Sequence, residues 1–479
     1  MTLQNKRIHQ IIALFLFIVI ILNPFDIISL PNNQVFAVAI TLFISYLWIT
    51  EAVALPVASL FLVVLIPLTG IMPIKDTLEA FANPIIFLFL GGFIFGLVFE
   101  KWHFHKRLAL HIINKVGFSP KRIILAFMVS TCFLSMWISN TATTIIMLPI
   151  ALSIISLIEQ VNTNSIKEMR DFSKALVISL AFGSNIGGYA TLIGSPPNAL
   201  LSGFLREFHA IDLSFLKWML IGIPFMLLSF IPAYFGITLA FSFNNLKIEA
   251  VKMSLQEEIK TMGRLKQPEI CIIVVGIITI TLLIVKDWVN SLINYEALSD
   301  TLILIAAALI FFLIPVKHEK NKFMLQWSDT EKMSWGVLYL FGGALCLANM
   351  LQETGIINSL GELFIGVSSL PSYFVLGLLL IMILIITEFI SGTAICSVFI
   401  PTVFTIAASL NIDLLYIAVP VTLAANVAYL TPIGTAPNAI ILSKGNITTI
   451  DIARAGLLIK VVSFILLQFF VTWWIRVIL

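Results

Sequence analysis

Two short polar stretches interrupt long apolar runs of this chain and carry residue types that could bind ions. The first runs from Gly183-Ser184-Asn185 to Thr-Leu-Ile-Gly-Ser-Pro-Pro-Asn at 191–198, and the second from Ala424-Ala425-Asn426 to Thr-Pro-Ile-Gly-Thr-Ala-Pro-Asn at 431–438. Upstream of each lies a shorter stretch, Ser-Asn-Thr-Ala at 139–142 and Ser-Gly-Thr-Ala at 391–394. A helix that unwinds at such a stretch frees carbonyls, which suit a small cation, and exposes N–H groups, which suit a carboxylate. The four stretches contain no Arg or Lys, so an anion bound there would need co-bound cations and helix dipoles.

A purely structural explanation exists for each stretch, because Gly and Pro are common in membrane helices and Ser and Thr often bond to their own helix. Four such stretches in a two-by-two arrangement disfavour it. Asn140 is the strongest single candidate, since an amide in lipid needs partners. Asn198 and Asn438 either contact the ligand or cap the unwound segments. Glu388 is an acid deep in an apolar run, and proton coupling and stabilisation of the hairpin are both open for it.

The composition identifies the class of protein. The chain has 479 residues, of which 59% are hydrophobic and 11% charged, whereas soluble domains carry about 25% charged residues. Apolar runs long enough to span a bilayer recur along the chain, and backbone groups in lipid must be paired, which predicts an all-α polytopic membrane protein. The four Cys and six His show no metal-ligand spacing and no nucleophile–base pair. We therefore expect no enzyme, no organic cofactor and no nucleic-acid partner.

The apolar pattern predicts eleven transmembrane helices and two re-entrant hairpins. The helices are expected at 10–31, 35–50, 52–71, 82–100, 175–204 (broken), 214–243, 268–286, 299–315, 334–352, 413–443 (broken) and 453–477, and the hairpins at 122–157 and 371–407. With both hairpins re-entrant, 22 of the 28 Lys and Arg residues fall on one face and 5 on the other, and Lys460 lies inside the last predicted helix. The positive-inside rule then predicts a cytoplasmic N-terminus and an extracytoplasmic C-terminus.

The chain also repeats itself. Gly91-Gly92 recurs at Gly342-Gly343, Ser139 at Ser391, and the Pro-Asn pair at 197–198 recurs at 437–438. We expect an N-terminal helix at 1–33, a first repeat at 34–243, a cytoplasmic linker at 244–266 and a second repeat at 267–479. An odd number of spans per half inverts the second repeat. Inverted repeats with interrupted helices at matching positions are typical of secondary transporters.

At these residues the chain resembles the divalent anion:sodium symporter family over almost its whole length. The resemblance rests on 139–141, its second copy at 391–393, Ile-Gly-Ser-Pro-Pro-Asn at 193–198, Ile-Gly-Thr-Ala-Pro-Asn at 433–438 and Trp-Gly-Val-Leu-Tyr-Leu-Phe-Gly-Gly at 335–343. The resemblance implies a homodimer in the plasma membrane that works by an elevator motion of a transport domain against a fixed scaffold.

The resemblance also implies the binding residues. The Na⁺ ligands would be Ser135, Ser139, Asn140 and the Gly194 backbone at one site, and Thr387 with the backbone near Ile390 and Gly434 at a second. Substrate would contact Asn140, Thr141, Ser195, Thr393 and Thr435, with Asn198 and Asn438 as further candidates. One departure matters: the family usually has Asn where this chain has Gly392. Weaker sodium dependence, a different anion and a switch from symport to exchange are all compatible with it.

The resulting hypothesis is a sodium-coupled symporter that imports C4-type dicarboxylates such as succinate, malate or fumarate. The alternatives are a sodium-independent dicarboxylate exchanger and a permease of the same fold for sulfate or another divalent anion.

Overall fold

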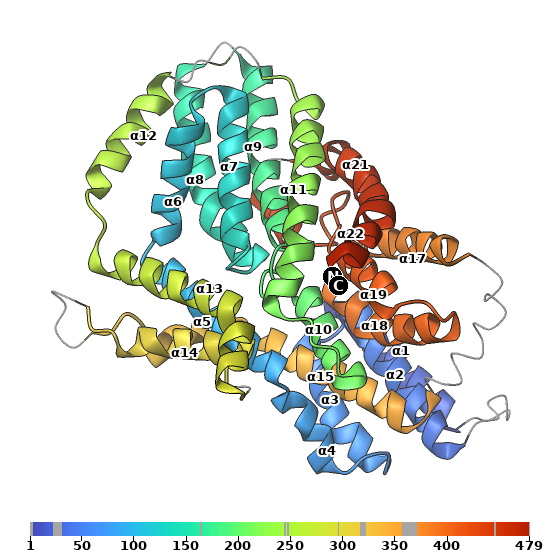
Figure 1. Cartoon of the computed structure of the whole chain (residues 1–479). Helices are drawn as coiled ribbons and strands as arrows, with labels where there is room; N and C mark the ends of the chain where they lie inside the picture. The colour runs from blue at the N-terminus through green and yellow to red at the C-terminus, as the bar shows by residue number, and fades with distance from the viewer. Residues whose placement is uncertain are drawn as a thin grey trace.

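The computed structural model describes residues 3–22, 31–162, 165–243, 246, 249–295, 297–316, 322–356, 371–444 and 447–478. Helices dominate this part of the chain, and an isolated bridge between Pro315 and Phe323 accounts for its β-structure. Figure 1 shows the helices as a group of near-parallel rods, α6 to α9 and α11, beside a second group that crosses them. The expected all-α architecture is confirmed.

Nine helices or continuous helical stretches in the described residues are long and apolar enough to cross a membrane. These spans are Gln4–Leu22, Asn32–Thr50, Ile74–Lys101, Asn140–Gln160, Phe215–Ala240, Gln267–Ile293, Trp335–Glu353, Gly392–Ser409 and Thr449–Ile478. Four shorter apolar helices accompany them: Leu55–Leu68, Asp300–Leu313, Ser372–Ile386 and Leu414–Ala425. The protein is therefore a multi-pass membrane protein.

Each predicted hairpin consists of two helices joined by a short connection. In the first, α7 (Pro120–Ser135) is followed by α8 (Asn140–Val161), and in the second, α17 (Ser372–Ile386) is followed by α18 (Gly392–Ser409). The second helix of each pair begins at a serine cap, because Ser139 Oγ accepts from Ala142 N and Ser391 Oγ accepts from Ala394 N. The polar tips are thus helix N-termini.

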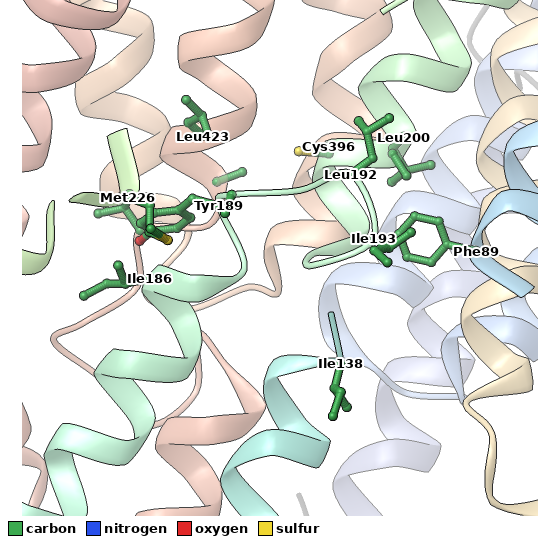
Figure 2. Close-up of a cluster of buried hydrophobic side chains, with 14 of the residues drawn as sticks. Phe89, Ile138, Ile186, Tyr189, Leu192, Ile193, Leu200, Met226, Cys396 and Leu423 are labelled. Carbon is green, nitrogen blue, oxygen red and sulfur yellow. The ribbon is translucent and has the colours of Figure 1, made fainter. Parts of the chain in front are cut away.

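Both predicted broken helices are interrupted where the polar stretches lie. The first break separates α9 (Ile166–Gly187) from α10 (Pro196–His209), and the second separates α19 (Leu414–Ala425) from α20 (Ala436–Lys444). Figure 2 shows the first break as a non-helical segment in which Tyr189 lies beside Met226 and Ile193 faces Phe89. Apolar packing on both sides therefore holds an unwound backbone in the interior.

The remaining helices agree with the predictions within a few residues at most ends. They are α1 (Leu3–Leu22), α2 (Asn32–Thr50), α3 (Leu55–Leu68), α5 (Pro84–Lys101), α11 (Phe215–Ala240), α13 (Gln267–Ile293), α14 (Asp300–Leu313) and α15 (Trp335–Glu353). A short helix before α5, α4 (Ile74–Glu79), lies outside the predicted ranges, and α13 extends beyond its predicted end at 286. α1 begins earlier than predicted and ends at Leu22, and the expected continuation over 23–30 lies outside the described residues.

The last predicted helix, 453–477, is continuous but not uniform. It comprises α21 (Thr449–Ile465), a π-helical turn at Leu466–Val471 and α22 (Thr472–Ile478). In the π-helical turn, the side-chain amide of Gln468 donates to Tyr373 O on α17 at 2.8 Å. The turn thus coincides with a polar contact between the last helix and the second hairpin.

The two basic segments outside the predicted spans form helices of their own, α6 (Phe104–Val116) and α12 (Glu249–Met262). Arg107 of α6 forms a buried ion pair with Glu269 at 2.6 Å, and its guanidinium also donates to Gly263 O at 2.8 Å. α6 is therefore tied to the start of α13 by a charged contact.

Candidate functional site

The four polar stretches converge on one cavity of about 750 Å³. Its lining combines both hairpin tips with both helix breaks, although the chain separates them by up to three hundred residues. The lining includes Ser139, Asn140, Thr141, Gly194, Ser195, Ser391, Gly392, Thr393, Asn426, Gly434 and Thr435, together with Glu51, Phe89 and Phe93. Five of the residues predicted to contact substrate therefore face a common space: Asn140, Thr141, Ser195, Thr393 and Thr435.

The electrostatics of this cavity come from helix ends and not from basic side chains. Glu51 is the one ionisable residue among the described residues that line it. Four helices, α8, α10, α18 and α20, begin at its wall, and helix N-termini carry a partial positive charge and free N–H groups. Four others, α7, α9, α17 and α19, end nearby and supply carbonyl oxygens. The arrangement suits an anion and cations bound side by side.

The first hairpin tip brings oxygen atoms together around Asn140. Its Oδ1 position lies 2.6 Å from Ser135 Oγ, 3.0 Å from Ser184 O and 3.2 Å from Gly194 O. With the amide nitrogen at that position, it donates to the other three atoms. This orientation pairs the amide with all three oxygens without an ion, and a bound Na⁺ would require the amide to turn so that its oxygen joins the other three. Three of the four predicted ligands, Ser135, Asn140 and Gly194, thus meet.

Ser184 was not among the predicted sodium ligands, although it lies in the quoted Gly-Ser-Asn stretch. The atom that it places beside Asn140 is its backbone carbonyl oxygen, near the end of α9, and the identity of a side chain gives no signal for a backbone oxygen. Ser139, the remaining predicted ligand, uses its hydroxyl to cap α8.

The second hairpin tip repeats part of this arrangement. Thr387 Oγ1 donates to Ala425 O at 2.7 Å. The Gly434 backbone packs so closely that a Cβ there would lie 2.4 Å from Thr387 O. At Gly392 a Cβ would lie 2.2 Å from Ala425 O, so the glycine permits a backbone approach that no side chain allows. Ile390 donates its backbone N–H to Ile386 O. This half thus holds a hydroxyl and a carbonyl but has no amide oxygen from the tip.

Two asparagines that sequence reasoning did not assign to the site cross-link its halves. Ser195 Oγ donates to Asn426 Oδ1 at 2.5 Å, and Asn426 Nδ2 donates to Asn198 Oδ1 at 3.1 Å. Reciprocally, Asn185 Nδ2 donates to Thr435 Oγ1 at 3.2 Å. Both asparagines lie in the polar stretches, Asn185 at the start of the first and Asn426 at the start of the second, and this position was the sequence signal that could have identified them. Each contacts the Ser or Thr of the opposite break, so they join the two breaks directly.

Asn198 and Asn438 are fully buried, outside the lining of the cavity, and make matching bonds. Asn198 Nδ2 donates to Gly188 O and Thr191 O, each at 2.8 Å. Asn438 Nδ2 donates to Ala428 O at 3.1 Å and Thr431 O at 3.0 Å. Each amide thus caps its own unwound segment, the structural alternative for these residues, and contact with substrate stays a prediction.

Glu388 is paired with Lys460 of α21 at 2.5 Å, and both side chains are buried. The carboxylate also accepts from the backbone N–H groups of Tyr429 (3.1 Å), Leu430 (3.0 Å) and Thr431 (2.9 Å). Of the two roles left open for Glu388, these bonds favour stabilisation of the hairpin. Sequence reasoning noted both charges inside apolar runs but did not pair them.

Comparison with known proteins places the chain in a family. The model of the sodium:sulfate symporter transmembrane region matches residues 4–479. A sodium-dependent dicarboxylate transporter, SdcS, of Staphylococcus saprophyticus is 34% identical over 474 residues, covering 97% of this chain and 91% of the relative. SdcS of Staphylococcus aureus strain USA300 is 34% identical over 467 residues, covering 95% and 88%. The chain therefore belongs to the divalent anion:sodium symporter family of membrane transporters.

Proposed function

We propose that this protein is a sodium-coupled symporter that imports C4-type dicarboxylates such as succinate, malate or fumarate. The observation that carries the proposal is the shared cavity, where four helix N-termini and several hydroxyls adjoin the oxygen cluster around Asn140. The names of the SdcS relatives support sodium dependence and a dicarboxylate substrate.

In the proposed site, Na⁺ binds Ser135, Asn140 and the carbonyls of Ser184 and Gly194. Ser139 completes this part of the predicted set, and Thr387 with the backbone near Ile390 and Gly434 offers a second position. The substrate carboxylates bind the hydroxyls of Thr141, Ser195, Thr393 and Thr435 and the amide of Asn140. Because the described cavity wall has no basic side chain, bound Na⁺ offsets the charge of the dianion, and this coupling requires both to bind together.

We further propose that residues 34–243 and 267–479 are inverted repeats within an eleven-span protein, with residues 1–33 as the first helix and 244–266 as the cytoplasmic linker. The matching bonds of Asn198 and Asn438 support this. In the proposed mechanism the two hairpins and the two broken helices move as an elevator in a homodimer of the plasma membrane, with the N-terminus in the cytoplasm.

The proposal is tested by uptake of radiolabelled succinate into proteoliposomes, with an inward sodium gradient compared with an equal potassium gradient. We expect uptake only with sodium, and competition by unlabelled malate and fumarate. Equal uptake in both gradients, stimulated by internal dicarboxylate, would identify the exchanger. Uptake of labelled sulfate that succinate does not inhibit would identify the permease. Empty liposomes and the Asn140→Ala variant are the controls.

A further inference from the structure

The second unwound segment is held by charges that lie within the protein. Three consecutive backbone N–H groups, those of residues 429–431, donate to the carboxylate of Glu388, which follows α17 in the hairpin. Lys460 donates to the same carboxylate and, at 2.5 Å, to Val427 O. Thr431 Oγ1 also donates to Glu388 O. Hairpin and unwound segment are therefore joined through both the side chain and the backbone of Glu388.

The corresponding place in the first half has no charges. Met136 precedes Glu388 by 252 residues, the spacing that also relates Ser139 to Ser391. Met226 precedes Lys460 by 234 residues. The close backbone approaches at Gly222 and Gly456, which have the same spacing, support the alignment of Met226 with Lys460. A Cβ at Gly222 would meet Tyr189 O at 2.3 Å, and a Cβ at Gly456, also 234 residues later, would meet Tyr429 O. Figure 2 shows Met226 beside Tyr189.

The first unwound segment uses its N–H groups differently. Tyr189 N donates to Ile186 O at 3.1 Å and Ala190 N donates to Gly187 O at 3.2 Å, so these groups continue the preceding helical turn. Thr191 Oγ1 donates to Met136 O at 2.6 Å, which parallels the bond of Thr431 to Glu388. The other polar contact between this hairpin and its segment is the approach of Asn140 to Gly194 O. That contact is a hydrogen bond when the amide nitrogen of Asn140 faces Gly194 O, and both residues are among the proposed sodium ligands.

We propose that Glu388 and Lys460 are positioning residues that hold the second hairpin tip on its unwound segment without sodium, whereas at the first tip bound sodium strengthens the weaker attachment made by Asn140 and Thr191. The sodium part of this inference rests on the proposed function. Sodium binding would then organise the first half of the cavity, with Thr141 and Ser195. The second half, with Thr393 and Thr435, would already be formed.

The chemistry of the pair fits this role. A buried ion pair stabilises a structure only when further hydrogen bonds satisfy both charges, and here three N–H groups and one carbonyl do so. Lys460 and Glu388 neutralise each other, so the pair adds no net charge to compete with the substrate. Removing one partner leaves an unpaired buried charge, whereas replacing both by Met copies the residues of the first half.

Hydrogen–deuterium exchange on the full-length protein in lipid nanodiscs tests the proposal. In the wild type, we expect sodium to slow exchange over residues 187–195 and to leave exchange over 429–431 unchanged, because the amides of 429–431 are held by Glu388 and the proposed second sodium position lies beyond them, at Gly434. In the double variant Glu388→Met/Lys460→Met, the amides of 429–431 lose their acceptor, and we expect exchange there to be about tenfold faster with or without sodium. Segment 187–195 should keep its sodium response.

A matched control is the buried ion pair of Lys286 and Asp300, 2.8 Å apart, which joins α13 to α14 away from the cavity lining. Lys286→Met/Asp300→Met should lower the melting temperature without accelerating exchange over 429–431. Unchanged exchange over 429–431 in the Glu388/Lys460 variant would refute the proposal, as would equal sodium protection of 187–195 and 429–431 in the wild type. The comparison of sodium protection between the two segments uses the wild-type protein, so it can be made even if the double variant does not fold.

Failure of the proposed function gives a different result. In that case neither segment responds to sodium, and uptake shows no sodium dependence. The double variant still decides whether Glu388 and Lys460 hold the second segment, because its exchange is measured without sodium.

Discussion

The hydroxyl groups of Tyr189 and Tyr429 hydrogen-bond to each other, although 240 residues separate them. Both side chains are fully buried, and each belongs to one of the two unwound segments. Together with the bonds of Asn185 and Asn426, this contact makes the two breaks one continuous polar structure across the cavity. We therefore expect the breaks to respond as a unit when either is altered.

Removing either tyrosine hydroxyl should destabilise the protein because the remaining hydroxyl loses a buried partner. We expect Tyr189→Phe and Tyr429→Phe each to lower stability by about 1–3 kcal/mol. The double variant should lose less than the sum, as expected for residues in contact. Thermal unfolding in detergent measures this, with Tyr234→Phe as control, since the Tyr234 hydroxyl is near the surface. Strictly additive losses would contradict the coupling.

Asn140→Ala should abolish sodium-dependent succinate uptake. The substitution removes the amide that approaches Ser135, Ser184 and Gly194, so the oxygen cluster loses its central member. Uptake into proteoliposomes over a range of sodium concentrations is the measurement. Asn290→Ala is the matched control, because its amide bonds to Leu298 at the end of α13. Full sodium-dependent uptake by Asn140→Ala would disprove the assigned site.

Asn198→Ala and Asn438→Ala should act mainly on stability. Each removes two hydrogen bonds that cap an unwound segment and leaves two buried carbonyls without that partner. A loss of about 2–4 kcal/mol is expected from two such bonds, with partial uptake and a sodium concentration for half-maximal uptake close to that of the wild type. A large change in that concentration at normal melting temperature would instead indicate direct ligand contact.

Gly392→Ala should impair transport because the added Cβ would lie 2.2 Å from Ala425 O, a backbone atom that cannot rotate away. Asparagine at this position would meet the same atom, so Gly392→Asn should also fail to improve sodium dependence. Gly377→Ala in α17 is the matched control, since its Cβ would lie 3.4 Å from the nearest atom, Gln468 Oε1. Normal uptake rates in Gly392→Ala would show that the tip can shift.

Single cysteines at Ser195 and Thr435 should exchange accessibility between the two membrane faces if the proposed alternating access is correct. Both residues line the cavity, so a membrane-impermeant maleimide reaches them only from the face to which it opens. The native cysteines Cys132, Cys346 and Cys396 are buried, and Cys271 is partly buried, so all four are first replaced. Identical labelling in conditions that favour inward- and outward-facing states would count against alternating access.

The sequence by itself determined which segments are helical and where helices break. Hydropathy is a local property, and Gly, Pro and Asn mark a break within a few residues of it, so the interruptions after Gly187 and Ala425 could be predicted. The types of ligand atom could be predicted for the same reason, because hydroxyls and amides are visible in the motifs at 139–141 and 193–198.

The tertiary structure alone decided how these pieces meet. The pairing of Glu388 with Lys460 joins residues 72 positions apart, and no local pattern encodes which buried charge meets which. The cross-links of Asn185 and Asn426 depend on packing two breaks face to face. Whether Asn198 caps its own segment or faces the cavity depends on which side of α10 is buried, and side-chain packing across the whole molecule sets that orientation.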